Sequence, residues 1–408
     1  MVNNRIKFLD GIRFILAFWV VLGHFYTLIG GIKLYRFNPF IENILKMPIV
    51  AVFGFMIITG FLMMHNFLIR EKIEPTNLKS TFIKFWLRRF FRLYPLYMIL
   101  IFAAFFSFEY ISTLNAKNLY YFTGSNITQW GFVLSTVQPS MADLISHIFL
   151  IHGLIPQFHD SILGVTWSLS LEMQFYFIFP FLFMIFFKDR IVQKRRLALL
   201  LISCTLLAFI SPRLFNLLST LTVSQNFREP SFISYTMPLF LLGMVMGGVK
   251  HKKISPMFLI MSLVLLMPFQ IILTNIMIGI ILLFLFLDEM KIISPSFLYR
   301  LLSSISIALS GKIAEFGANI SYSLYLIHTL VISIVLDAVI LHESVFNYNK
   351  HVIVLVSLII TIVICVCLCY ILYTFIERPL IALGKRIISS KLPTATTAIG
   401  SLHIIEKV

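Results

Sequence analysis

The sequence predicts an all-α fold, a polytopic helix bundle that crosses a membrane about ten times and keeps both termini on the cytoplasmic side. Of the 408 residues, 59% are hydrophobic and 12% are charged, whereas soluble domains have roughly half and a quarter. The mean hydropathy of +0.94 excludes a cytosolic enzyme, a secreted disulfide scaffold and a disordered chain. The hydrophobic residues also fall in long runs, which a membrane protein needs and a soluble one avoids.

Ten apolar segments are long enough to cross the hydrocarbon core of a bilayer. They cover residues 8–30, 48–69, 84–107, 163–187, 197–212, 231–249, 255–270, 272–288, 313–340 and 351–376. The first segment has a basic start, but its apolar stretch is too long for a cleaved signal peptide, so we expect an uncleaved helix. The boundaries of the seventh and eighth segments are the least distinct.

The distribution of cations predicts the orientation. Counted on alternate sides of the ten segments, 25 Lys and Arg lie on the side of the termini and seven on the other. The positive-inside rule makes the first side cytoplasmic and places the long loop 108–162 outside. One membrane domain accounts for residues 1–380, and residues 381–408 form a short cytoplasmic tail. The densest inner clusters are Lys188, Arg190, Lys194, Arg195 and Arg196, then Lys250, Lys252 and Lys253, then Arg378, Lys385 and Arg386.

The net charge of +16 does not indicate nucleic-acid binding, because the cations lie in short clusters between apolar segments without a nucleic-acid motif. Three of the four cysteines form a C-x-C-x-C run, which on a helix points thiols in different directions, so we expect no bound metal. His147, His152 and His159, irregularly spaced in the long loop, do not change this expectation. The cysteines all lie in apolar stretches: Cys204, Cys365, Cys367 and Cys369.

Ionisable residues inside spanning helices are costly and therefore mark candidate functional positions. The first helix contains Asp10, Arg13 and His24. Arg13 and His24 are 11 residues apart, which returns them to within about 20° of one face, roughly 16 Å apart along the axis. A single helix face thus links the inner boundary to the middle of the membrane. A lone histidine is also compatible with a packing role, but its position below Arg13 on one face favours general-base chemistry.

The third helix opens with Arg88, Arg89 and Arg92. Positive-inside anchoring explains cations at this place. A polyanion site explains their density better, because guanidinium groups match phosphate oxygens and a helix N-terminus favours anions. We therefore predict that these arginines bind the phosphates of a donor.

Two further helices contribute polar side chains. The fourth contains Ser168 and Glu172. The ninth contains Ser321, Tyr325 and His328 at i, i+4 and i+7, so these three share one face. We expect His24, Glu172 and His328 at similar depths, with the arginines on the inner side. His24 is the predicted base, and either Glu172 or His328 orients or assists it.

Six motifs occur in the order found in a known family. Residues 8–13 with His24 are similar to that family's L-D-G-x-R start and R-x10-H pair, residues 85–97 to its R-R-x-x-R stretch and residues 166–172 to its T-W-S-L-S-V-E signature. Two departures are Thr59 in place of Ser and Leu171 in place of Val. The sequence therefore resembles the acyltransferase-3 family of integral membrane O-acyltransferases. The motifs are residues 8–13 with His24, 54–62, 85–97, 166–172, 320–328 and 377–379.

The resemblance implies a bacterial inner-membrane enzyme that moves an acetyl group from cytoplasmic acyl-CoA to a hydroxyl of a surface saccharide, such as lipopolysaccharide O-antigen. It implies that Arg13 and His24 are the essential pair and that Arg89 and Arg92 bind the donor. Acetyl-CoA is then a substrate, and no tightly bound cofactor is expected. Exopolysaccharide, peptidoglycan and secondary metabolites are alternative acceptors, and a homo-oligomer is compatible with the sequence.

Two alternatives remain open at this stage. Direct transfer and transfer through an acyl-enzyme both fit the residues. A transporter or flippase of an anionic lipid-linked sugar would also use a basic inner cavity with His and Glu at mid-membrane depth. The lack of an inverted repeat speaks against transport, and loss of the acyl-CoA thioester would separate the two.

Overall fold

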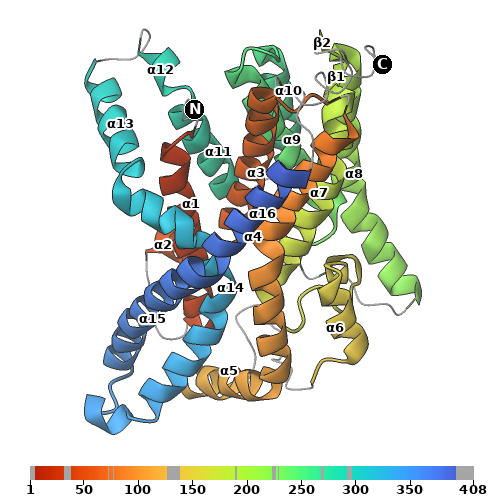
Figure 1. The fold of residues 1–408 in the computed structure, drawn as a ribbon. Helices are drawn as coiled ribbons and strands as arrows, with labels where there is room; N and C mark the ends of the chain where they lie inside the picture. Colours follow the sequence, from red (N-terminus) through yellow and green to blue (C-terminus); the bar gives the residue numbers. More distant parts are fainter. Residues whose placement is uncertain are drawn as a thin grey trace.

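The computed structural model describes residues 5–31, 38–71, 73–76, 78–125, 138–188, 191–222, 227, 229–267, 271–291 and 296–391. Within this part, the predicted membrane-spanning helical bundle is confirmed: eight helices are long and apolar enough to cross a membrane (Figure 1). They are α1 (Phe8–Leu28), α3 (Ile49–Arg70), α4 (Lys79–Phe106), α7 (Trp167–Phe186), α8 (Lys194–Thr222), α9 (Ile233–Lys250), α14 (Lys312–Ile340) and α15 (Lys350–Leu372), which runs on through a π-helical turn (Tyr373–Glu377) into α16 (Arg378–Lys391).

The seventh and eighth predicted segments form shorter helices, α10 (Pro256–Leu266) and α11 (Ile272–Leu285), of 11 and 14 residues. At 1.5 Å per residue they reach about 17 and 21 Å, less than the roughly 30 Å of a hydrocarbon core. The short α12 (Leu287–Met290) and α13 (Ser296–Leu309) follow them. Periodicity did not predict α13 as a separate element, because its 14 residues are shorter than a span.

Other predicted boundaries shift at helix ends. Helix α4 starts five residues before the predicted 84, so its arginines lie two to three turns inside the helix. Helix α8 continues ten residues past the predicted 212, through Pro212. A two-residue strand pair, β1 (Phe187–Lys188) and β2 (Ile191–Val192), joins α7 to α8 with Phe187 opposite Val192. Arg190 lies outside the described residues.

Helices α3 and α9 form the closest pair in the bundle because both present glycine at their crossing. A Cβ on Gly60 would lie 2.1 Å from the carbonyl oxygen of Phe240, and one on Gly243 would lie 2.0 Å from that of Ile57. Real side chains cannot approach that closely. Gly60 and Gly243 therefore act as packing residues that let the two helices approach closely.

The predicted outer loop 108–162 contains helices α5 (Phe108–Thr123) and α6 (Met141–Ile148) and the 3-10 turn His152–Leu154. A second 3-10 turn, Gly164–Thr166, precedes α7, and the short helix α2 (Pro39–Lys46) lies between α1 and α3 in the sequence. Residues 126–137 lie outside the described part. Tyr94 and Tyr97 of α4 tie this layer down by donating to the carbonyl oxygens of Ile148 and His147, both at 2.9 Å. In Figure 1, α5 and α6 lie at the opposite end of the bundle from the N-terminus.

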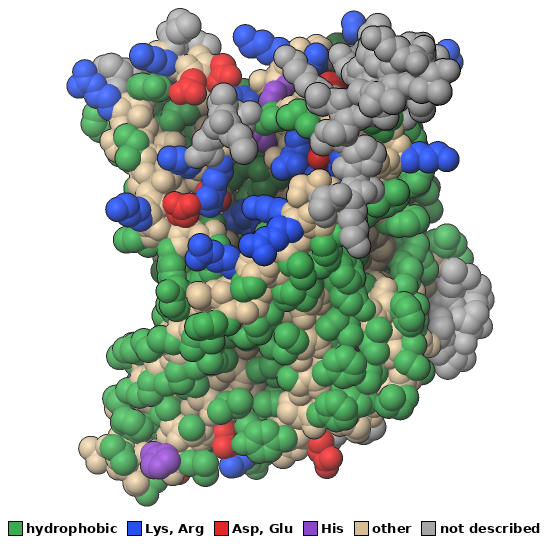
Figure 2. All heavy atoms as spheres, in the orientation of Figure 1, with side chains coloured by type: hydrophobic (Ala, Val, Ile, Leu, Met, Phe, Trp, Pro, Cys, Tyr) green, Lys and Arg blue, Asp and Glu red, His purple; other side chains and the backbone are tan. Residues whose placement is uncertain are grey.

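Lys and Arg gather on the end of the molecule where the N-terminus lies, while a broad apolar band covers the rest of the face in Figure 2. This is the distribution on which the predicted orientation depends. Which end faces the cytoplasm remains a prediction from charge. Among the described residues, no group of three His, Cys, Asp or Glu side chains could hold a metal ion.

Candidate functional site

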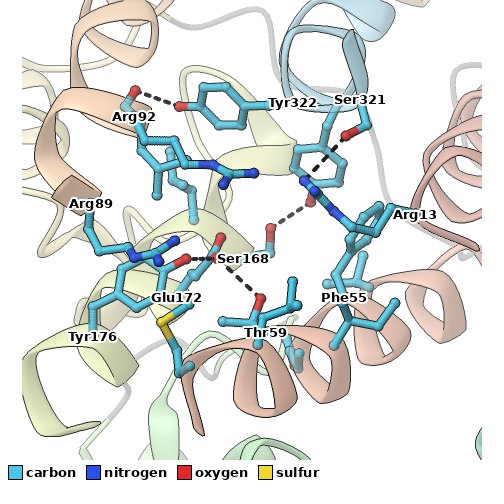
Figure 3. Close-up of a pocket in the computed structure, with 18 of the residues that line it drawn as sticks. Arg13, Phe55, Thr59, Arg89, Arg92, Ser168, Glu172, Tyr176, Ser321 and Tyr322 are labelled. Carbon is cyan, nitrogen blue, oxygen red and sulfur yellow. Dashed lines mark hydrogen bonds between the residues drawn. The ribbon is translucent and has the colours of Figure 1, made fainter. Parts of the chain in front are cut away.

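A buried pocket of about 110 Å³ lies where α1, α3, α4, α7 and α14 converge. Its polar lining comes from residues far apart in the sequence, as Figure 3 shows. The rest of the lining is aliphatic and aromatic. The polar residues of this reaction pocket are Arg13, Thr59, Arg89, Arg92, Ser168, Glu172, Tyr176, Ser321, Tyr322 and Tyr325.

Three guanidinium groups dominate the charge of the reaction pocket. Arg92 on α4 and Arg13 on α1 point into it from opposite sides (Figure 3), and Arg13 donates to the hydroxyl of Ser321 at 3.5 Å. Arg89 lies 5.4 Å from the ring centre of Tyr176, and its Nε has no partner among the described residues. Buried cations without full hydrogen bonding favour an anionic ligand.

One carboxylate faces these three cations. Glu172 accepts a short hydrogen bond from Tyr176, one turn further along α7, and a second from Thr59 of α3 at 3.3 Å. Two hydroxyl donors hold the carboxylate against the pocket wall. With three cations against one anion, the pocket keeps a net positive charge that a ligand can neutralise.

A larger cavity of about 490 Å³ adjoins the reaction pocket and shares Arg13, Leu62, Arg92 and Tyr322 with it. We call it the vestibule. Arg5 and Arg70 also line it, and Figure 2 shows Lys and Arg side chains around a hollow near this end of the molecule. The two cavities together form a positively charged path from the end with the termini into the bundle.

Two acidic side chains line the vestibule. Asp10 forms an ion pair with Arg5 at 2.7 Å and so balances a cation of the entrance. Burial by itself lowers the pKa of the Arg5 guanidinium, whereas the Asp10 carboxylate raises it, and the net pKa lies above the ordinary value. Glu377, in the π-helical turn before α16, accepts a short hydrogen bond from Ser323 of α14 and interacts electrostatically with Arg92 and with Arg13.

The two predicted histidines contact each other rather than the reaction pocket. Their ring centres are 4.9 Å apart, and Nε2 of His328 lies 3.1 Å from Nδ1 of His24. Nδ1 of His24 lies 3.0 Å from the carbonyl oxygen of Val20, and Nδ1 of His328 lies 3.0 Å from that of Leu324. Neither ring is among the residues that line the pocket.

These contacts determine the tautomers of the neutral rings. A carbonyl oxygen only accepts, so Nδ1 carries the proton in both His24 and His328. Nε2 of His328 then accepts from the Nδ1–H of His24. Nε2 of His24 is left with its lone pair, and no described residue donates to it. His24 therefore has the form of a base, oriented by His328.

A hydroxyl pair lies between the histidines and the reaction pocket. The hydroxyls of Ser168 and Tyr325 are 2.6 Å apart, and Tyr325 also donates to the carbonyl oxygen of Val165 at 2.9 Å. The Tyr325 ring centre is 6.1 Å from that of His328 and 6.4 Å from that of Phe55. Tyr325 thus touches both regions and forms the wall between them.

The structure brings together most of the residues that the sequence singled out, in two groups. Arg88 is different: both of its terminal nitrogens bond to the carboxylate of Glu74, at 2.9 and 2.7 Å, and it lines neither the pocket nor the vestibule. Sequence reasoning missed Tyr176 and Glu377. The i, i+4 spacing from Glu172 marks the first, and the Glu-Arg-Pro ending marks the second.

Comparison with known proteins agrees with this geometry. The family model described as an acyltransferase domain, acyltransferase-3, matches residues 6–374. The chain belongs to the acyltransferase-3 family. The match includes every helix that lines the reaction pocket, so the pocket lies within the domain that defines the family.

A curated relative of this chain is the nose resistant to fluoxetine protein 6 of Caenorhabditis elegans, which is 24% identical over 204 residues. The similar segment is 46% of this chain and 23% of the relative, so the chain spans about a quarter of that protein. No solved structure matches the chain.

Proposed function

We propose that this acyltransferase of the bacterial inner membrane moves an acetyl group from acyl-CoA to a hydroxyl of a cell-surface saccharide, such as lipopolysaccharide O-antigen. The observation that carries the proposal is the position of the arginine-lined pocket, between the basic vestibule and the His24–His328 pair. The basic vestibule suits a phosphorylated donor. The histidine pair on the other side of the pocket presents a base to a hydroxyl acceptor.

The donor enters through the vestibule in this proposal. Its phosphates interact with Arg5, Arg70 and Arg92 at the positively charged entrance, and the thioester reaches the pocket beside Arg13. Charge-assisted contacts between guanidinium groups and phosphate are among the strongest hydrogen bonds in proteins. Arg88, paired with Glu74, has no part in this step.

His24 removes the acceptor proton through its free Nε2 as the hydroxyl oxygen attacks the thioester carbonyl. The C–S bond then breaks, and the proton passes to the departing CoA sulfur. The hydroxyls of Ser168 and Tyr325 are the nearest donors for the oxyanion. Direct transfer requires the Tyr325 wall to open, and transfer through an acyl-enzyme is the alternative route.

Mass spectrometry of surface polysaccharide tests the proposal, using cells with matched membrane levels of wild type, His24→Ala and Arg13→Ala. Acetyl mass should appear only with wild type. Arg213→Ala is the control, because this exposed arginine bonds to its own helix and lines neither cavity. An unchanged acyl load with His24→Ala would contradict the base assignment.

Release of free CoA thiol by purified protein completes the test. An acyltransferase consumes the thioester when an acceptor is present, whereas a transporter of a lipid-linked sugar leaves it intact. Thioester that stays intact with every saccharide acceptor supplied would overturn the proposal.

A further inference from the structure

A third cavity, of about 480 Å³, lies between α8, α9 and the end of α10. It shares no lining residue with the reaction pocket or the vestibule. Phe53 and Leu239 line this lateral cavity, while their chain neighbours Val52 and Phe240 line the reaction pocket. The closely packed α3–α9 layer therefore separates the two, and the acyl-transfer chemistry does not account for the lateral cavity.

Two polar side chains in the lateral cavity lack partners among the described residues. The carboxylate of Glu229 lines the cavity, and the structure gives it no hydrogen bond or ion pair within the described part. Thr236 is 2% exposed, and its hydroxyl has no hydrogen-bond partner there either. Burial, with the nearby Asp160 carboxylate, raises the pKa of Glu229 to about 7. Glu229 itself is partly exposed, whereas a buried unpartnered hydroxyl such as that of Thr236 is rare unless a ligand satisfies it.

The described residues around Glu229 contribute negative charge, since the carboxylate of Asp160 lies nearby. No Lys or Arg is among the described residues that line the cavity. His159 accepts the backbone N–H of Glu229 at 3.1 Å through Nε2, and its Nδ1 lies 2.8 Å from the carbonyl oxygen of Pro156. This tautomer is neutral, so His159 supplies no counter-charge. Within the described part of the cavity, an ammonium group would therefore complement the Glu229 carboxylate.

Aromatic rings surround the same place. Phe227 and Tyr235 line the cavity, and Phe215 packs against both, with ring centres 5.2 and 5.9 Å away. Ring faces attract ammonium groups when the cation is desolvated. Aromatic faces and one carboxylate together are well suited to a substituted ammonium ion.

Apart from Thr205 and Asn216, the remaining described lining is apolar, and the adjoining helix presents exposed apolar side chains. Leu239, Leu266 and Ile271 line the cavity. The adjoining helix α8 exposes Leu206 and Leu214, 53% and 49% accessible, as expected of a helix that contacts acyl chains. The ligand that fits therefore has an ammonium head and hydrocarbon chains.

We propose that the lateral cavity binds an amine-headed membrane phospholipid, with Glu229 as the counter-ion of the ammonium group and Thr236 as a second polar contact. The ammonium head occupies the aromatic end of the cavity. The acyl chains leave toward the surface of α8. This site does not depend on the acyl-transfer reaction, and its test needs no acyl donor.

Native mass spectrometry of the full-length protein, titrated with phosphatidylethanolamine and phosphatidylglycerol of identical acyl chains, tests the proposal. The two lipids share the phosphate and differ in the ammonium group. Wild type should bind phosphatidylethanolamine about tenfold tighter or more. Glu229→Gln should remove the preference, and Thr236→Val should weaken binding a few-fold. Glu109→Gln, an exposed carboxyl on α5, is the matched control.

Equal affinity of wild type for the two lipids would overturn the proposal, as would an unchanged preference in Glu229→Gln. Free ethanolamine that competes as well as the lipid would overturn the lipid assignment in favour of a soluble amine. Melting temperatures of the variants show whether they are folded, and Thr236→Val gives a second reading should Glu229→Gln be unstable.

The preference should also depend on pH. Because the pKa of Glu229 is raised to about 7, its carboxyl is mostly neutral at about pH 6 and ionised at about pH 8, while the lipid amine stays protonated at both. Affinity for phosphatidylethanolamine should rise about tenfold between them. The other titratable groups near Glu229 are Asp160, His159, Tyr235 and Tyr325. They act on both lipids alike, so phosphatidylglycerol is the control for their effects.

Discussion

Arg13 and His24 lie on the same helix and face the same side, yet their surroundings are opposite. Arg13 points into a cavity with other cations, where Glu172 and Glu377 balance only part of the charge. His24 lies in a chain of neutral hydrogen bonds that ends on two backbone carbonyl oxygens. The two ends of one helix therefore differ in charge and in hydrogen bonding. In the proposed mechanism, the charged end binds the donor and the neutral end transfers the proton.

The largest effect should come from His24→Ala. A positioned general base contributes about 10²- to 10⁴-fold to rate, so kcat should fall by that factor while the Kd for acyl-CoA stays near the wild-type value. Steady-state kinetics with a direct binding assay separates the two quantities. A loss of acyl-CoA affinity as large as the loss of kcat would contradict this prediction, because it would mean that His24 contributes to donor binding.

Arg92→Ala should weaken binding of the acyl-CoA donor. Removing one guanidinium contact to phosphate costs about 1.5–3 kcal/mol, which raises the KM for acyl-CoA about 10- to 100-fold. Arg88→Ala is the matched control from the same helix, and its KM should change less than about threefold because its partner is Glu74. An equal increase in the KM for acyl-CoA in the two variants would mean that Arg88 also binds the donor.

His328→Leu should reduce kcat roughly tenfold, because it removes the acceptor that orients His24. Asn or Gln at this position keeps an acceptor oxygen, so His328→Gln should recover part of the activity. The pH profile of kcat should shift in His328→Leu and return toward wild type in His328→Gln. A merely structural role predicts lower protein levels and an unmoved profile.

The smallest effect should come from Glu377→Gln. This variant keeps the hydrogen bond from Ser323 but removes the negative charge near Arg92 and Arg13. A more positive vestibule should lower the KM for acyl-CoA a few-fold and make it more sensitive to salt. A higher KM, measured at the same ionic strength, would instead mean that Glu377 holds the arginines in place.

Much of this architecture could be predicted from local patterns. The long helices form where apolar runs predict them. The predictions were wrong for the shorter apolar segments. Helices α10 and α11 are too short to cross a bilayer alone, and α13 was not predicted. Hydropathy measures the apolar content of a segment and does not report where a helix stops.

The candidate site was predictable as a set of residues and not as an arrangement. Equal depth of His24, Glu172 and His328 was a fair inference from helix direction, but depth does not specify which faces meet. Glu172 lies against Tyr176 and Thr59, and the histidines lie against each other. Arg88, Arg89 and Arg92 are close in sequence, yet 100° per residue turns Arg88 toward Glu74.

The sequence by itself determined the membrane, the helices and the residue types available for chemistry, since hydropathy and charge act locally along the chain. The tertiary structure alone decided which side chains face one another: the tautomer of His24, the pairing of Arg88 and the joining of pocket and vestibule. It also created the lateral cavity around Glu229, whose lining comes from four helices and the segments between them. Contacts between helices depend on the rotation and tilt of each helix. These follow from the packing of whole helix surfaces and cannot be read from the sequence of a single segment.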